Sequence, residues 1–318
     1  MEKISRVYVA GGQTLIGTAI LRQLEQQRYT NILGKAGEEP DLTNAEAVDD
    51  FFAHQAPEYV FVAAGRSGGI EANRKYPAEL MLNNLLVGCH LIHSAYRYGV
   101  KKLLYLASSC CYPRHCPQPM RVESLLTGTF EPTNEAYAIA KIAGIILCQA
   151  FRLQYGANYI VGIPANVFGP DDDFSPEDSH VIAALMRKIY LAKTSGAPSV
   201  GIWGTGTPRR EFLFADDLAD ACLFVMQEYE SAEPINLGGG TDLSIAELAE
   251  LVKEVVGYQG ELRFDASRAD GMPLKVLDSR RLITMGWRPV TSFRVALAAT
   301  LNAYLKTQKE LTDARTAL

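Results

Sequence analysis

The chain has 318 residues, of which 48% are hydrophobic and 21% are charged, and its formal net charge is -5. This length supports one large α/β domain together with a smaller lobe. The negative charge and the lack of a long Lys/Arg run argue against nucleic acid as a partner, and no apolar run reaches the roughly 18 positions of a membrane span. The six cysteines lack the paired spacings of a disulfide framework, and the N-terminus lacks a signal-peptide pattern. We therefore expect a cytoplasmic protein that binds neither nucleic acid nor a membrane.

Strand and helix patterns alternate along the first half of the chain. Apolar runs predict strands, and apolar residues at helical spacing predict the helices between them, in the order 7–10 (strand), 16–27 (helix), 30–33 (strand), 45–54 (helix), 59–63 (strand), 80–98 (helix), 103–107 (strand), 135–155 (helix) and 159–163 (strand). This alternation predicts a Rossmann-type, doubly wound parallel sheet. Catalytic groups and cofactor gather beyond the carboxyl ends of such strands, where Gly11, Ala64, Ser108 and Pro164 lie.

A glycine-rich turn follows the first predicted strand. Gly11 and Gly12 precede the first predicted helix, Gly17 lies in its first turn, and Thr14 stands where the second phosphate-facing glycine of a G-x-x-G-x-x-G loop would lie. Glycines let the backbone approach a pyrophosphate, which then sits against the free N–H groups at the helix start. The alternative is a plain tight turn. The strand before it and the helix after it favour a dinucleotide site.

Tyr137 and Lys141 are spaced four residues apart in a predicted helix, so both side chains lie on one face. An ammonium beside a tyrosine favours the phenolate and lowers the pKa of the phenol, and a hydroxyl such as Ser108 can share the substrate oxygen. By itself this spacing is also typical of an amphipathic surface pair. Together with the dinucleotide turn it indicates carbonyl chemistry.

The second half of the chain lacks the regular alternation of strands and helices. A Gly/Pro/Asp-rich loop over residues 168–176 precedes a helix that begins near Ser179, and later patterns predict a strand over 201–203 and helices over 216–227 and 244–256, the last with a Ser244–Glu247 capping box. Because no flexible linker appears, the second lobe is expected to interleave with the first. We expect residues 1–167 plus about 208–237 to bind the cofactor, and residues about 168–207 plus 238–318 to form a smaller, interleaved C-terminal α/β lobe.

Two clusters deserve a test as metal sites. The aspartates at 171–173 lack the spacing of a calcium loop and are interpreted as a solvated loop. Cys110, Cys111, His115 and Cys116 lack the paired C-x-x-C knuckles of a structural zinc site. We therefore expect no metal.

Longer segments, spread over nearly the whole chain, carry a more specific signal. They include Gly68-Gly69-Ile70 with Asn73, Ser108-Ser109-Cys110 with Tyr112-Pro113, Glu131-Pro132-Thr133-Asn134-Glu135, Tyr137 with Lys141, Asn166 with Gly169-Pro170, Ser179-His180-Val181-Ile182, Arg210-Glu211-Phe212-Leu213 and Asp270-Gly271. In these segments the chain resembles the extended short-chain dehydrogenase/reductase family, and within it the epimerase/reductases of GDP-linked 4-keto-6-deoxy sugars. The resemblance implies epimerisation at C3 and C5, then NADPH-dependent reduction of the C4 ketone, and a homodimer joined by a four-helix interface.

The resemblance also implies residue roles. Cys110 would be the base that removes a proton, and His180 the acid that returns one on the opposite face. Tyr137 would protonate O4 as hydride reaches C4, Ser108 would bind the same oxygen, and Lys141 would hold the nicotinamide ribose. Nucleotide-sugar contacts are implied for Lys188, Trp203, Arg210 and Asp270.

The implied NADP(H) contacts come from the glycine turn and from strand ends. They are Gly11, Gly12, Gln13, Thr14, Leu15, Ile16, Gly17, Lys35, Leu106, Ala107, Ser108, Ser109, Lys141, Pro164, Ala165, Asn166, Val167 and His180. Gln13 replaces an arginine typical of the family, and Lys35 is expected to supply a compensating charge for the 2′-phosphate. No acidic residue ends the second predicted strand to bind an NAD ribose, which favours NADPH.

Two other functions remain open at this point. One is a sibling epimerase/reductase that acts on another GDP-linked 4-keto sugar, of colitose or 6-deoxyheptose type, or that performs only one of the two steps. The other is a non-catalytic nucleotide-binding scaffold with the same fold. Individual residues also have simpler explanations. Cys110 can be a small buried thiol and His180 a polar residue at a helix start. The proposed nucleotide-sugar residues can be surface ion pairs and, for Trp203, a packed indole.

Overall fold

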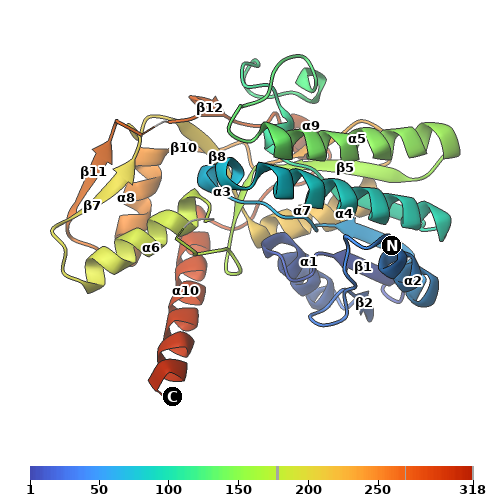
Figure 1. Cartoon of the computed structure of the whole chain (residues 1–318), viewed down its shortest axis with the longest axis horizontal. Helices are drawn as coiled ribbons and strands as arrows, with labels where there is room; N and C mark the ends of the chain where they lie inside the picture. Colours follow the sequence, from blue (N-terminus) through green and yellow to red (C-terminus); the bar gives the residue numbers. More distant parts are fainter. Residues whose placement is uncertain (177–178, 269, 317–318) are drawn as a thin grey trace.

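The structure is a computed structural model that describes residues 1–176, 179–268 and 270–316, and its centre is a six-stranded sheet (Figure 1). The strand order is β2-β1-β3-β4-β5-β9, and all neighbours pair in parallel. The strands are β1 (Arg6–Ala10), β2 (Asn31–Leu33), β3 (Tyr59–Val62), β4 (Lys102–Leu106), β5 (Tyr159–Pro164) and β9 (Ile235–Leu237). Every residue of β4 and β5 is buried, as in a strand covered on both faces.

Helices cover both faces of this sheet. On one face α4 (Pro77–Arg97) packs against α2 (Ala45–Gln55) and α5 (Glu135–Tyr155), and on the other α1 (Leu15–Gln26) packs against α7 (Ala215–Glu228) (Figure 1). The predicted doubly wound α/β fold is therefore confirmed.

A second group of elements surrounds its own hydrophobic core, which includes Phe168, Ile189, Leu248 and Leu297. One small sheet has the order β10-β8-β12 with β6 beside β8, and β7 pairs with β11. These elements are β6 (Asn166–Phe168), α6 (Val181–Thr194), β7 (Ser199–Trp203), β8 (Arg209–Phe214), β10 (Asp242–Ser244), α8 (Ile245–Val256), β11 (Glu261–Asp265), β12 (Leu274–Lys275) and α10 (Phe293–Thr316). Two short helices, α3 (Ile70–Lys75) and α9 (Arg280–Thr284), complete the fold. Strand β8 of the second group is followed by α7, which covers the large sheet, and by β9, which belongs to it. The chain therefore returns to the large sheet and its helices, the first group, before it ends in the second group.

Helix α5 is long and apolar enough to qualify as a membrane span by length and composition, with a mean hydropathy of 1.5 over its most apolar window. In the structure its inner face, including Ala138, Ile145 and Cys148, is buried in the core, and it also carries Lys141. Core helices of soluble proteins pass the same test. We attribute the composition of α5 to packing.

Candidate active site

A cavity of about 890 Å³ lies where the carboxyl ends of β1, β3, β4 and β5 face α6, β7 and β8. This is the edge of a parallel sheet at which ligands bind. All of the predicted catalytic side chains line it, namely Ser108, Cys110, Tyr137, Lys141 and His180. The predicted nucleotide-sugar residues line it too, namely Lys188, Trp203, Arg210 and Asp270.

The glycine turn has the geometry of a phosphate-binding loop. Thr14 Oγ1 accepts from Gly17 N at 3.0 Å and donates to Gly11 O at 2.8 Å, so the threonine caps α1 and closes the loop. A Cβ at Gly12 would lie 1.9 Å from Gly34 O, and a Cβ at Gly17 would lie 1.9 Å from Gly11 O. The loop therefore fits a dinucleotide pyrophosphate against the first amides of α1.

Sequence reasoning missed Glu39, which supports this turn from outside the cavity. Its carboxylate accepts from Gly11 N at 2.6 Å and from Tyr8 Oη at 3.0 Å. Burial raises the pKa of Glu39 above its ordinary value. Glu39 lies in an irregular segment after β2, so no periodic pattern marks it.

Lys35 does not reach the cavity. Its Nζ pairs with Glu25 Oε1 at 2.7 Å on the surface beside α1, and the side chain is 46% exposed. Gln13, Thr14, Leu15 and Ile16 line the cavity at this end. In this structure the Lys35 ammonium, which is expected to bind the 2′-phosphate, therefore forms an ion pair with Glu25.

The cofactor side of the cavity continues along the ends of β4 and β5. Leu106, Ala107, Pro164, Ala165, Asn166 and Val167 line it as predicted. Asn166 Nδ2 donates to Glu211 O at 2.8 Å, which ties the start of β6 to β8. Of the remaining predicted cofactor residues, Gly11, Gly12 and Gly17 shape the turn without lining the cavity.

Ser109 and Cys111 are buried and do not line the cavity. Cys111 Sγ lies 3.9 Å from Ala138 O, and burial raises the pKa of this thiol to about 12. Cys111 is thus a core residue, unlike Cys110. Within residues 1–176, 179–268 and 270–316, no group of three or more His, Cys, Asp or Glu side chains is arranged to hold a metal ion.

Tyr137 and Lys141 lie one turn apart on α5. Lys141 Nζ donates to Leu106 O at 3.3 Å and lies 6.0 Å from the centre of the Tyr137 ring. Burial lowers the pKa of Lys141 to about 8, and burial raises the pKa of Tyr137 while a hydrogen bond with Ser108 opposes that rise. The expected lowering of the tyrosine pKa by Lys141 is not found: burial raises this pKa, and the neighbouring Cys110 and Cys111 raise it further. The phenol stays protonated, which is the form that a proton donor needs.

Ser108 is the N-cap residue of a short helical turn, η1 (Ser109–Cys111), that follows β4, and Cys110 is the middle residue of this turn. Ser108 Oγ accepts from Cys110 N at 3.2 Å. Cys110 Sγ in turn accepts from Asn134 Nδ2 at 3.2 Å and from Lys275 Nζ at 3.4 Å. The sequence alone assigned a role to neither donor. Asn134 lies in the 131–135 segment that resembles the family, whereas Lys275 belongs to a two-residue strand that is too short to show a periodic pattern.

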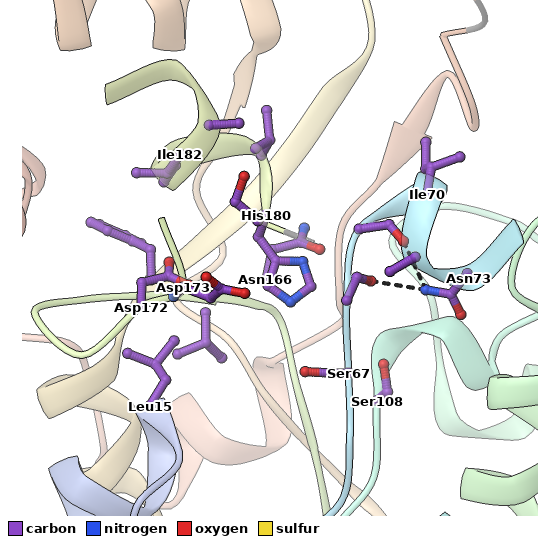
Figure 2. Close-up of a pocket in the computed structure, with 18 of the residues that line it drawn as sticks. Leu15, Ser67, Ile70, Asn73, Ser108, Asn166, Asp172, Asp173, His180 and Ile182 are labelled. Carbon is purple, nitrogen blue, oxygen red and sulfur yellow. Dashed lines mark hydrogen bonds between the residues drawn. The ribbon is translucent and has the colours of Figure 1, made fainter. Parts of the chain in front are cut away.

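His180 is the N-cap residue of α6, and its imidazole points into the cavity beside Asn166 and Asp173 (Figure 2). Burial lowers the pKa of His180, the Lys275 ammonium lowers it further, and Asp173 opposes both. The imidazolium of His180 therefore gives up its proton more readily than that of a free histidine. Figure 2 shows that the ring faces the side of the cavity that carries Ser67 and Ser108.

The interpretation of residues 171–173 as a solvated loop is wrong for Asp172, whereas Asp171 and Asp173 are exposed. Asp171 pairs with Arg22 Nη1 at 2.5 Å. Asp172 lines the cavity, where its Oδ1 accepts from Asp173 N at 2.9 Å and its Oδ2 is shielded from solvent with no hydrogen-bond partner in the described part of the chain. Burial raises the pKa of Asp172 to about 7. The cavity wall thus contains a carboxyl group that titrates near neutrality.

An indole marks the far end of the cavity. Trp203 is 51% exposed, and the Lys188 ammonium lies 4.6 Å from its ring centre. The Arg268 guanidinium, which sequence reasoning missed, lies 5.1 Å from the same ring. An exposed flat ring beside two cations suits a nucleobase and its phosphates.

Arg210 and Asp270 lie next to each other at this end. Arg210 Nη2 donates to Asp270 O at 3.4 Å, and burial lowers the pKa of the guanidinium. The Asp270 carboxylate accepts from Thr205 N at 2.7 Å and from Thr205 Oγ1 at 2.8 Å. Both side chains are thus oriented before any ligand contacts them.

Comparison with known proteins agrees with this geometry. The chain is 51% identical to GDP-L-fucose synthase 1 of Arabidopsis thaliana over 96% of this chain and 94% of that protein. It is 45% identical to GDP-L-fucose synthase of Escherichia coli (strain K12) over 95% of this chain and 97% of that protein.

A solved structure with NADP bound has the same architecture. It is a GDP-L-fucose synthetase from Naegleria fowleri, with a TM-score of 0.89 and 27% identity over 97% of this chain and 96% of that chain. Residues 7–238 match the model of the family described as NAD dependent epimerase/dehydratase. The chain is therefore a member of the NAD dependent epimerase/dehydratase family.

Proposed function

We propose that this protein converts GDP-4-keto-6-deoxy-D-mannose to GDP-L-fucose by epimerisation at C3 and C5 and NADPH-dependent reduction at C4. The observation that carries the proposal is that both sets of predicted catalytic groups line one cavity: Ser108, Tyr137 and Lys141 for reduction, Cys110 and His180 for proton transfer. The identity of 51% and 45% to GDP-L-fucose synthases over nearly the whole chain favours this substrate over that of a sibling enzyme.

The glycine turn and the ends of β4 and β5 hold NADP(H). The tight approach at Gly12 and Gly17 leaves room only for hydrogen at these positions, which fits a backbone that cradles a pyrophosphate. When bound, NADPH supplies the hydride that reduces the sugar at C4. The lack of an acidic residue at the end of β2 supports NADPH over NADH.

Reduction needs a proton at O4 of the sugar. Tyr137 donates it, and burial keeps this phenol protonated until the alkoxide develops. Ser108 donates a hydrogen bond to the same oxygen, and Lys141 binds the nicotinamide ribose next to Tyr137.

Epimerisation uses the acidity that the C4 ketone gives to the protons at C3 and C5. Cys110 removes a proton from one face of the ring, the electrons of the C–H bond form an enolate, and His180 returns a proton to the opposite face. Both carbons flank C4, so one thiol and one imidazole serve both positions.

The nucleotide lies at the other end of the cavity. Lys188 and Arg210 bind the diphosphate, Trp203 packs against the base, and Asp270 accepts from a hydroxyl. The cation–ring distance of 4.6 Å between Lys188 and Trp203 supports this grouping.

The two hydrophobic cores support a division of the chain by ligand, with exceptions near the boundaries: Phe212 and Phe214 of β8 pack in the second core, and Leu277, Leu282 and Trp287 pack in the first. We assign residues 1–167 plus about 208–237 to NADP(H), and residues about 168–207 plus 238–318 to the nucleotide-sugar. We place the protein in the cytoplasm.

The outer faces of α4 and α5 expose large apolar side chains. Leu82 and Tyr96 on α4, and Ile139, Ile146 and Leu153 on α5, are between 38% and 91% exposed. This surface supports a homodimer in which two helices from each subunit form a four-helix interface.

Turnover of GDP-4-keto-6-deoxymannose tests the function, with NADPH or NADH as reductant and the product's configuration determined by NMR. We expect GDP-L-fucose and a clear preference for NADPH. A product with unchanged configuration at C3 and C5 would identify a reductase alone, and turnover only of another GDP-linked 4-keto sugar would identify a sibling enzyme.

A further inference from the structure

The thiol of Cys110 lies against a cation from a distant part of the chain. Lys275 belongs to β12, which pairs in parallel with β8 so that Lys275 is the register partner of Arg210. This pairing places Lys275 Nζ 3.4 Å from Cys110 Sγ, across 165 residues of sequence. In the part of the chain that the structure describes, no carboxylate forms an ion pair with Lys275.

A second donor completes the surroundings of the sulfur. Asn134 Nδ2, at the start of α5, lies 3.2 Å from Cys110 Sγ. Two N–H donors that converge on one sulfur, one of them charged, stabilise a thiolate more than a neutral thiol, because a thiolate is the better acceptor. A small thiol buried for packing alone needs neither donor.

We propose that Lys275 is the positioning residue that holds Cys110 as a thiolate for proton abstraction, with Asn134 as the second donor to the sulfur. The proposal rests on the role of Cys110 as the base of the proposed function. In the step itself the thiolate takes the proton from C3 or C5 and becomes a neutral thiol, while the C–H electron pair becomes the enolate. The charge thus leaves the sulfur next to Lys275 and appears on the sugar oxygen held by Ser108 and Tyr137.

The other ionisable groups around Cys110 come from three elements. Arg210 of β8 interacts electrostatically with the sulfur but donates to backbone carbonyls, and Tyr137 of α5 is kept protonated partly by the nearby thiol. His180 of α6 feels the same ammonium, which lowers its pKa. Lys275 is therefore the cation in direct contact with the sulfur, and it acts on both the base and the acid.

Alkylation of the thiol in the free enzyme tests the proposal without a substrate. Iodoacetamide is added at neutral pH, and labelling of each cysteine is followed by mass spectrometry of peptides. Cys116, which is partly exposed and lies outside α4 and α5, is the internal reference. In Lys275→Met we expect Cys110 to react about tenfold more slowly while Cys116 reacts as before, with recovery at alkaline pH, and we expect Lys275→Arg to retain most of the rate.

Several outcomes would overturn the proposal. One is an unchanged rate at Cys110 in Lys275→Met, and another is a slow rate that persists at alkaline pH, since that would indicate access rather than ionisation. Lys101→Met, which removes an exposed lysine paired with Glu58, is the matched control. Unchanged NADPH affinity shows that each variant is folded.

Exchange of substrate protons with solvent connects the thiolate to catalysis. We expect Lys275→Met to slow deuterium entry at C3 and C5 about as much as it slows alkylation. If Cys110→Ser retains full exchange, the base of the proposed function is wrong even where alkylation still depends on Lys275. If Lys275→Met weakens only GDP binding and leaves alkylation unchanged, Lys275 is a phosphate ligand and the proposal fails.

Discussion

Burial fixes the protonation states of the residues that carry the reaction. Tyr137 and Lys141 share one buried face of α5, and burial disfavours the charged form of each, so the phenol is neutral and the pKa of the ammonium falls to about 8. A neutral phenol is a proton donor. The site is therefore set for reduction before a substrate contacts it.

Replacing Tyr137 by Phe removes this donor and nothing else from the cavity wall. We expect the reduction rate in Tyr137→Phe to fall by roughly 10²-fold or more, because positioned general acids typically contribute that much. NADPH affinity, measured by fluorescence titration, should change little. Reduction at a rate close to that of the unmodified enzyme would show that another group protonates O4.

Asp172 makes the stability of the protein depend on pH. Burial raises its pKa to about 7 from an ordinary value of 3.8, so between these values the folded state binds more protons than the unfolded state. The free energy of unfolding therefore falls as the pH rises through this window, by about 1.4 kcal/mol per pH unit at most from this group.

We expect Asp172→Asn to lose this part of the pH dependence, as measured by urea unfolding at several pH values. Asp173→Asn, at the neighbouring exposed position, should keep it. Equal slopes in Asp172→Asn and in the unmodified protein would mean that Asp172 ionises as freely in the folded state as in the unfolded one.

Sequence reasoning located the residues whose spacing is local. Ser108, Tyr137 and Lys141 follow a strand or share a helix face, and the structure brings them to one cavity. It gave no role to Lys275, whose contact with Cys110 depends on strand pairing in another part of the fold. It also placed Lys35 at the cofactor, where the structure pairs it with Glu25.

At the scale of elements, α4 and α5 each present a glycine to the same tyrosine, and only the glycine of α5 is required for the close approach. Gly144 of α5 faces the Tyr105 ring so closely that a Cβ would lie 2.2 Å from its Cζ, whereas a Cβ at Gly88 of α4 would meet the ring at 3.7 Å. Tyr105 is fully buried on β4. The approach of α5, and with it the position of Lys141, therefore depends on Gly144.

Gly144→Ala should destabilise the protein by roughly 1–3 kcal/mol through overpacking. Gly88→Ala is the matched control, because it makes an ordinary contact with the same ring and gains helix propensity of up to about 1 kcal/mol. Urea unfolding measures both. Equal stability in the two variants would contradict this packing.

The long helices and strands can be predicted from the periodicity of their apolar residues, whereas the short ones cannot. The predicted strands and helices of the first half agree with β1 to β5 and with α1, α2, α4 and α5 within a few residues. Helix α3 escaped prediction because six residues carry too little pattern. Asn73 Nδ2 stabilises its start by donating to Gly68 O at 2.8 Å and to Gly69 O at 2.9 Å (Figure 2).

At the scale of the whole molecule, the catalytic cavity lies between two separate hydrophobic cores. Ser108, Cys110, Tyr137 and Lys141 belong to elements of the first group, whereas His180 and Lys275 belong to the second. Proton transfer therefore requires both groups, and hydride transfer depends mainly on the first. The alternation of strands and helices predicts the first group, but the approach of the second is a tertiary property that periodicity does not encode.

The apolar surface of α4 and α5 leads to a prediction about assembly. We expect light scattering to give twice the mass of the chain, and we expect Ile146→Glu on α5 to shift this value to one chain. Leu191→Glu on α6 is the control, because Leu191 is 49% exposed and Ile146 is 45% exposed. A monomeric unmodified protein, or a dimer that Leu191→Glu disrupts instead, would contradict the four-helix interface.

The central claim is that one cavity performs both reactions on one sugar. Turnover of GDP-4-keto-6-deoxymannose with NADPH in deuterated water tests it most directly, with the product analysed by NMR. We predict GDP-L-fucose that carries deuterium at C3 and C5 and protium at C4, since the first two protons come from solvent and the third from NADPH. A reduced product that retains protium at C3 and C5 would contradict the claim.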